Sequence, residues 1–206
     1  MNILHLDSGL FAGQSVSRKL GAQLVERLQA QNPGSVVVHR DLIANAPAHL
    51  DGNLLLAGGK AEAERTPYEQ EQLALTQQFL DELFAADVLV IGAPMYNFSI
   101  PSQLKAWIDR IAQAGKTFRY TADGPEGLVK GKKAYVVSSR GGVYSEGPAA
   151  AMEHQESYLL AVLAFIGVTD VQVIRAEGLS LSDDAKGKAL RDAEAVINRT
   201  ATRVAA

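Results

Sequence analysis

The sequence contains no cysteine among its 206 residues. This absence excludes disulfide bonds, thiolate zinc sites, iron–sulfur clusters and a cysteine nucleophile. An excess of positive charge is absent as well, because 20 Lys and Arg residues face 23 Asp and Glu residues, giving a net charge of −3. A chain with this charge has no strong positive field to attract the phosphates of a nucleic acid, so we expect no nucleic-acid partner.

Long hydrophobic runs are also missing, since no stretch approaches the roughly 18 uninterrupted apolar residues that a membrane helix needs. The first residues, MNILHLDSG, lack a basic region followed by an apolar segment. We therefore expect no membrane association and a cytoplasmic location. What is present is an ordinary globular composition, 47% apolar and 21% charged, over a length that favours a single domain spanning residues 1–206.

Five short apolar segments bounded by turn residues predict β-strands. The runs at 88–91 and 134–137 do not alternate with polar residues, which is typical of strands covered on both faces of a parallel sheet. The predicted strands are residues 2–7, 35–41, 87–93, 133–138 and 168–176.

Helical patterns separate these strands. The clearest begins at Thr66, where Pro67 and Glu69 complete the signature of a capping box, and it predicts a helix to about residue 85. The alternation predicts an α/β fold, namely a flavodoxin-like doubly wound five-stranded parallel sheet with helices on both faces. Further helices are expected at 17–31, at 101–115, at 149–166, at 182–203 and, in a short form, around 54–56.

Ligands of open α/β sheets bind at the carboxyl ends of the strands, so the loops that follow the strands are informative. Residues 8–17 form a long loop that leads into a helix, and such a helix start offers free N–H groups to a phosphate. The hydroxyls of Ser15 and Ser17 would add donors. The alternative is that one serine merely caps the helix. Two segments are longer than ordinary connections: the excursion of residues 42–65, and a second excursion, residues 117–130, which we also expect beyond the carboxyl end of the sheet.

Two more loops complete the expected site. Residues 94–101 place an amide between two aromatic side chains and prolines at both ends, which suits a flat heterocycle, although aromatics that complete the core are an equal alternative. The paired glycines after the fourth strand permit close approach of the backbone to a ligand, or form an ordinary turn. One cofactor could touch all three loops, which are residues 8–17, 94–101 and 138–142.

Competing motifs find little support. No G-x-G-x-x-G follows a strand and no G-x-x-x-x-G-K-[ST] occurs, which disfavours Rossmann and P-loop nucleotide sites. Residues 13–17 approach the G-x-S-x-G nucleophile elbow but lack its last glycine. The four histidines, at 5, 39, 49 and 154, show no metal-ligand spacing, so they are interpreted as surface or packing residues and no metal is implied.

Several motifs together resemble those of bacterial FMN-dependent NADH-azoreductases, and the likeness spans nearly the whole chain. They are Ser-Val-Ser at 15–17, Pro-Met-Tyr-Asn-Phe at 94–98, Thr-Phe-Arg-Tyr at 117–120, Gly-Pro-Glu-Gly-Leu at 124–128 and Ser-Arg-Gly-Gly at 139–142. The resemblance implies a homodimer with one FMN per subunit near the interface. It also implies ping-pong two-electron transfer from NADH to quinones or aromatic azo compounds, with the flavin, not a protein residue, carrying the chemistry.

The resemblance further implies roles for individual residues. Tyr120 would lie in the substrate pocket, as a proton source or a packing residue. The family often has serine where Gly9 stands, so the Gly9 N–H or the neighbouring Ser8 would take its place. The phosphate would be held by Ser15, Val16 and Ser17, and the isoalloxazine bordered by Met95, Tyr96, Asn97, Phe98, Ser139, Arg140, Gly141 and Gly142.

Two rival functions stay open on sequence grounds. A flavodoxin-type FMN electron carrier would share the fold, but such carriers are usually strongly acidic, whereas this chain has a net charge of only −3. A serine hydrolase with Ser15 as nucleophile is the third choice.

Overall fold

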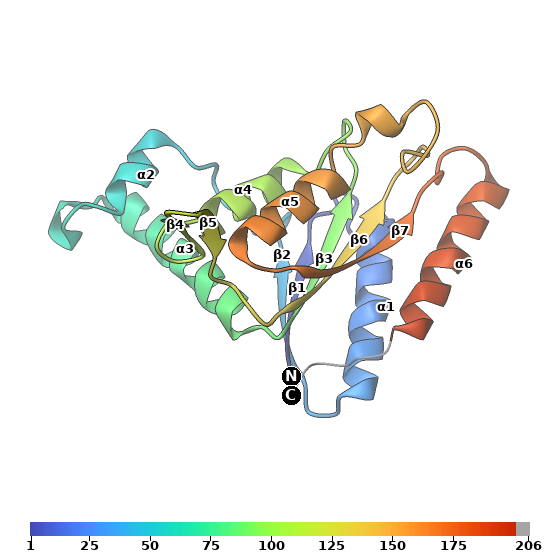
Figure 1. Ribbon diagram of the computed structural model, residues 1–206, viewed down its shortest axis with the longest axis horizontal. Coiled ribbons are helices and arrows are strands. Elements are labelled where there is room, and N and C mark those ends of the chain that lie inside the picture. Colours follow the sequence, from blue (N-terminus) through green and yellow to red (C-terminus); the bar gives the residue numbers. More distant parts are fainter. Residues whose placement is uncertain (201–206) are drawn as a thin grey trace.

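A computed structural model describes residues 1–200 of the chain (Figure 1). At its centre lies a parallel five-stranded sheet in the order β2-β1-β3-β6-β7, the predicted doubly wound arrangement. The predicted strands are all confirmed, with ends that differ by at most two residues. Their bounds are β1 Asn2–Asp7, β2 Val36–Asp41, β3 Val88–Pro94, β6 Lys133–Ser139 and β7 Asp170–Ala176.

The three central strands β1, β3 and β6 form because their side chains are buried on both faces of the sheet, whereas the edge strands β2 and β7 are largely half-buried or exposed. Every residue of β3 is buried, as its unbroken apolar run predicted. Alternate strand residues enter two separate cores: Leu4, Leu89 and Val136 face one side, and Ile3, Val88 and Val137 face the other. The sheet therefore presents a buried surface to a layer of helices on each side.

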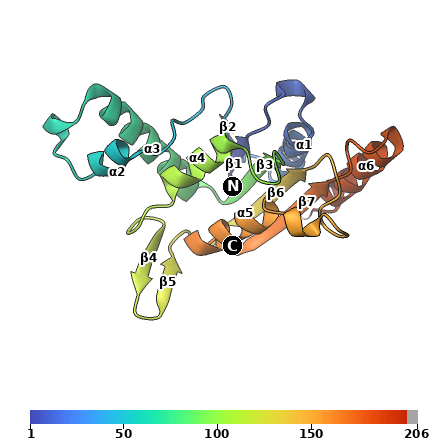
Figure 2. The ribbon, with the colours of Figure 1, turned by 90° about the horizontal axis from the view of Figure 1, so that it is seen from above.

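Helices α1 and α6 cover one face of this sheet and helices α3, α4 and α5 cover the other (Figures 1 and 2). The capping box predicted at Thr66 is present at the start of α3. None of the helices within residues 1–200 is long and apolar enough to cross a bilayer. The helices are α1 Val16–Gln31, α2 Gly52–Ala57, α3 Pro67–Ala85, α4 Ser102–Ile111, α5 Glu156–Ile166 and α6 Asp183–Arg199.

Three predicted helix boundaries were wrong or untestable. Helix α4 ends before residue 115 because the Thr117 hydroxyl donates to Ile111 O at 2.7 Å and accepts from Gln113 N at 2.9 Å. Helix α5 begins at 156 instead of 149, because the Glu153 carboxylate accepts the backbone N–H groups of residues 155–157 and fixes the start there. The predicted end of the last helix, residues 201–203, lies outside the described residues.

Residues 117–130 form a β-hairpin, β4 Phe118–Thr121 and β5 Gly124–Gly127, that the sequence did not predict. Its expected position beyond the carboxyl ends of the strands was wrong. Helix α4 returns antiparallel to β3, so the hairpin that follows it lies at the amino edge of the sheet. There it packs against the end of α5, with Val129 N donating to Ile166 O at 2.8 Å.

Candidate functional site

The three loops that follow β1, β3 and β6 meet at the carboxyl edge of the sheet, as predicted. Hydrogen bonds join them: Leu10 N donates to the Tyr96 hydroxyl at 3.1 Å, and Met95 N donates to Ser139 O at 2.8 Å. Between the loops lies a shallow cleft of about 240 Å³. Segments more than 120 residues apart in the chain thus form one concave surface.

Of the twelve residues predicted to bind the cofactor, seven line this cleft and five do not. The seven are Ser15, Val16, Met95, Tyr96, Ser139, Arg140 and Gly141. The five that are not among the lining residues are Gly9, Ser17, Asn97, Phe98 and Gly142. Sequence reasoning missed Phe11, Gln14, Pro94, Leu179 and Ser180, which also line it. The last two follow β7, so the rule of strand carboxyl ends, applied to the fifth strand, would have found them.

The start of α1 offers free backbone N–H groups to the cleft. Ser15 occupies the N-cap position, yet within residues 1–200 its side chain caps nothing in the first turn. The hydroxyls of Ser15 and Ser17 instead lie 3.1 Å from each other. The alternative that one of these serines only caps the helix is therefore not supported. The first turn also contains no acidic residue, so its positive dipole end is not neutralised by Asp or Glu.

Gly9 makes room for the serine pair. A Cβ at position 9 would lie 2.1 Å from Ser15 Oγ, so no side chain fits there while Ser15 keeps this rotamer. Ser8 does not take over a ligand-facing role, because its buried hydroxyl donates to Gly92 O at 2.6 Å. Among the described residues no histidine bonds to the Ser15 hydroxyl, so the geometry lacks the base that a serine nucleophile requires.

The loop after β3 contains a tight turn with unusual backbone torsions. Tyr96 and Ser99 exchange two backbone hydrogen bonds, at 3.0 and 3.1 Å, around Asn97 and Phe98. Both central residues have positive φ, +49° and +70°. Such torsions are uncommon for a residue as large as phenylalanine and gather at functional sites. The turn is held from behind by His154 N, which donates to Phe98 O at 3.0 Å.

The Arg140 side chain points into the protein, not toward the cleft. It is fully buried, and its Nη2 lies 2.9 Å from both Glu153 Oε1 and Glu156 Oε1. Its Nε donates to Gln155 Oε1 at 2.8 Å. Burial alone would raise the pKa of Glu153, but the backbone donors of residues 155–157 lower it. The part of Arg140 that can face a ligand is therefore its backbone.

Tyr120 is not brought to the cleft within this chain. It belongs to the β4–β5 hairpin, which projects from the rest of the fold (Figure 2). Its side chain is 74% exposed, and its ring centroid lies 5.5 Å from that of Phe118.

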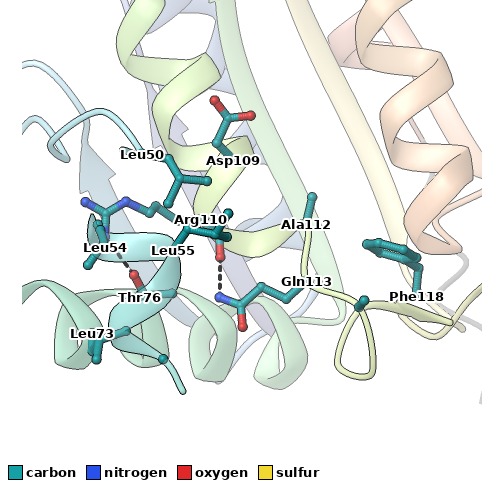
Figure 3. A pocket seen from close by; sticks show the side chains of 12 residues that line it. Leu50, Leu54, Leu55, Leu73, Thr76, Asp109, Arg110, Ala112, Gln113 and Phe118 are labelled. Carbon is teal, nitrogen blue, oxygen red and sulfur yellow. Dashed lines mark hydrogen bonds between the residues drawn. The ribbon is translucent and has the colours of Figure 1, made fainter. Parts of the chain in front are cut away.

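A second cavity, of about 420 Å³, lies between α2, α3 and α4 (Figure 3). Leucines from α2 and α3 line one side and Phe118 lines the other, and Arg110 reaches from α4 to donate to Thr76 Oγ1 at 2.9 Å. This arginine also donates to Ala48 O and so ties the 42–65 excursion to the fold. None of the predicted site residues lines this cavity.

The cleft can be compared with known proteins. Residues 1–200 match the Flavodoxin_2 family, which is described by its flavodoxin-like fold. An FMN-dependent NADH:quinone oxidoreductase from Sinorhizobium fredii is 54% identical over 96% of this chain and 95% of its own. Another from Delftia acidovorans is 52% identical over 98% and 95%.

Solved structures agree with these matches. An azoreductase from Bacillus anthracis str. Sterne superposes with a TM-score of 0.85 at 31% identity, covering 97% of this chain and 100% of its own. An FMN-dependent NADH-azoreductase from the Ames Ancestor strain, solved in complex with FMN, gives 0.85 at 27% identity over 97% and 99%. The chain therefore belongs to the flavodoxin-like family that contains the FMN-dependent NADH:quinone oxidoreductases.

Proposed function

We propose that this protein is an FMN-dependent oxidoreductase, a single domain over residues 1–206, that uses NADH to reduce quinones and aromatic azo compounds. The observation that carries the proposal is the meeting of an uncapped helix start and two rigid loops in one cleft. The relatives, which are FMN-dependent NADH:quinone oxidoreductases, support the cofactor and the reductant, and the azoreductase structures support the second class of acceptor.

The start of α1 fits the phosphate of FMN. Backbone N–H groups of Val16 and Ser17 are available there, and the paired hydroxyls of Ser15 and Ser17 can turn to donate to phosphate oxygens. The Gly9 N–H is a further donor in the same loop. Hydrogen bonds from such donors stabilise an anion most when the anion is partly buried, because protein screens the attraction between donor and anion less than water does.

The other two loops fit the edge of a flat ring. Met95, directly before the turn of residues 96–99, donates its backbone N–H to Ser139 O and so joins the two loops. Gly141 keeps side-chain bulk out of the cleft. When bound, FMN supplies the redox chemistry by taking hydride from NADH and passing two electrons to the acceptor. The cleft of 240 Å³ is below the roughly 300–1,000 Å³ of enclosing ligand sites, so one ring face would stay open to NADH and acceptor in turn.

Anaerobic stopped-flow mixing tests the proposal. The FMN-loaded protein is mixed with NADH, and the absorbance of oxidised flavin should fall rapidly and return when one equivalent of a quinone is added. Steady-state rates at several quinone concentrations should give parallel double-reciprocal lines, as ping-pong exchange requires. A flavodoxin-type electron carrier would bind FMN but show no rapid bleaching with NADH, and that result would remove the reductase proposal.

Replacing Ser17 by alanine should raise the dissociation constant of FMN at least about tenfold, because hydrogen bonds to charged groups contribute about 1.5–3 kcal/mol. Fluorescence titration of the apoprotein measures this constant. Ser102→Ala, which changes a serine at the start of a different helix, should bind FMN like the wild type. Equal affinities for the Ser17 variant and the wild type would place the phosphate elsewhere.

We also propose a cytoplasmic homodimer in which Tyr120 completes the pocket of the partner copy. Support comes from its exposure and from other exposed apolar side chains, including Phe11, which lines the cleft, and Leu160 on α5. Light scattering coupled to gel filtration tests the oligomer, with about 44 kDa expected for two chains of 22.0 kDa. Cell fractionation tests the compartment. A monomer would leave Tyr120 outside any pocket.

A further inference from the structure

Two neighbouring strands bring a pair of histidines and one aspartate together outside the cleft. His5 and His39 are direct register partners in the parallel pair β1 and β2. Asp7 lies two residues after His5 and so points to the same face of the sheet, the face covered by α1. The spacing of 34 residues between the histidines carries no motif, which is why the sequence interpretation of these histidines as packing or surface residues missed the cluster.

The three side chains converge on a small volume. His39 Nε2 lies 2.9 Å from Asp7 Oδ2, and His5 Nε2 lies 3.6 Å from Asp7 Oδ1. One nitrogen of each histidine and one carboxylate oxygen all lie within 4.8 Å of one another. His5 and Asp7 are more than nine-tenths buried, whereas the side chain of His39 is 49% exposed. The cluster therefore opens to solvent on one side only.

Two atoms of this cluster have no hydrogen-bond partner among the described residues. They are His5 Nε2 and Asp7 Oδ1, both buried and facing each other at a distance too long for a hydrogen bond. Buried polar atoms are nearly always satisfied, so this pair calls for a shared partner. Two glycines leave the space around them: a Cβ at position 21 would come within 2.9 Å of His5 Nε2, and one at position 92 within 3.1 Å of Asp7 Oδ1.

We propose that His5, Asp7 and His39 bind one Zn²⁺ ion, with water as the fourth ligand. In a tetrahedral zinc site with bonds of about 2.0–2.2 Å, neighbouring ligand atoms lie about 3.3–3.6 Å apart. His5 Nε2 lies 3.6 Å from Asp7 Oδ1 and His39 Nε2 lies 2.9 Å from the other oxygen, Asp7 Oδ2, and the three donor atoms all lie within 4.8 Å of one another, so small side-chain rotations would bring them to this spacing. Two imidazoles and one carboxylate are a common donor set for zinc, and the exposed side of His39 gives the water its position.

The surrounding charge suits a divalent cation. Arg18 approaches Asp7 Oδ2 to 3.7 Å, but its guanidinium is already paired with both oxygens of Asp41, at 2.7 and 2.6 Å. The carboxylates of Asp7 and Asp41 and the guanidinium of Arg18 leave a net charge of −1 beside the two histidines.

Zinc bound at this site would stabilise the fold and would take no part in the redox reaction. Zinc would join β1 to β2 at Asp7, directly before the loop of residues 8–17 that leads to α1. The ion would therefore hold the first residue of that loop in place, and it would not occupy the cleft. The proposal does not depend on the identity of the acceptor or of the reductant.

Calorimetric titration of the FMN-loaded, tag-free protein with Zn²⁺, after removal of metal by a chelator, tests the proposal. We expect one Zn²⁺ per chain and a rise in Tm on binding. Co²⁺ in place of Zn²⁺ should give the visible absorption bands of a four-coordinate site. His39→Gln and His5→Gln should each weaken binding at least about tenfold, whereas His49→Gln, an exposed histidine elsewhere, should bind like the wild type.

The decisive variant is His39→Gln, because this half-exposed side chain can be changed without disturbing the core. Circular dichroism would verify that the variant protein is folded. Loss of binding in this folded variant supports the site. Absence of saturable binding in the wild type would overturn the proposal, as would equal zinc affinity of the wild type and both variants, which would place the ion on other surface groups.

Discussion

Replacing Arg140 by methionine is expected to reduce the free energy of unfolding by about 3–5 kcal/mol. The guanidinium is fully buried and lies 2.9 Å from oxygens of Glu153 and Glu156 and 3.5 Å from Glu177. Methionine fills similar volume but leaves these carboxylates without their shared cation. Urea unfolding at neutral pH, followed by far-UV circular dichroism, measures the loss.

Two comparisons make this prediction specific. Arg119→Ala breaks an ion pair whose arginine is 60% exposed and should cost no more than about 1 kcal/mol. The difference in free energy of unfolding between the wild type and the Arg140 variant should also become smaller as pH falls from about 7 toward about 4.5. At the lower pH the carboxylates that have lost their cation become protonated and so lose their uncompensated charge. In the wild type the pKa values of Glu153 and Glu177 are lowered, so their contribution to stability is present above the ordinary carboxyl pKa and is lost below it. A deficit that is small, or that does not change with pH, would contradict this account.

The substitution Gly127→Ala should lower Tm by about 6–12 °C. Its Cβ would lie 2.2 Å from Gly167 N and 2.4 Å from both Gly167 Cα and Ile166 C. These are backbone atoms, so the hairpin must move away from the end of α5, and such overpacking costs about 3 kcal/mol, equivalent to about 2–4 °C per kcal/mol in a chain of this size.

Differential scanning calorimetry measures this shift. Gly52→Ala is the matched control, because a Cβ there meets nothing within 4 Å and the residue has no positive φ. The hairpin also carries Tyr120, so the Gly127 variant should lose acceptor reduction more than FMN affinity if Tyr120 lines a partner's pocket. An unchanged Tm would mean that the hairpin does not pack against α5 in solution.

The sheet was predictable because its signals are local. Apolar runs such as 88–91 mark strands buried on both faces, and the capping box at Thr66 marks a helix start. The rule that ligands bind at strand carboxyl ends then located most of the cleft, including the two loops joined by Met95 N and Ser139 O. These features depend on residues close together in the chain.

The features that the sequence did not predict depend on contacts between residues far apart in the chain. The start of α5 is set by Glu153, whose position depends on the buried Arg140. The direction of the Arg140 side chain, away from the cleft, follows from three carboxylates that no spacing rule connects. The meeting of His5 and His39 requires the register of two strands. Local sequence patterns cannot predict these contacts, because the residues that make them come together only when the sheet is assembled.

The distribution of the cleft along the chain has a consequence for its biosynthesis. The cleft draws its walls from residues 11–16, 94–96, 139–141 and 179–180. A chain still growing on the ribosome exposes the serines early but lacks the third wall until β6 emerges, and the fourth until β7 has followed. The coenzyme would therefore find its complete cleft only on a nearly finished polypeptide.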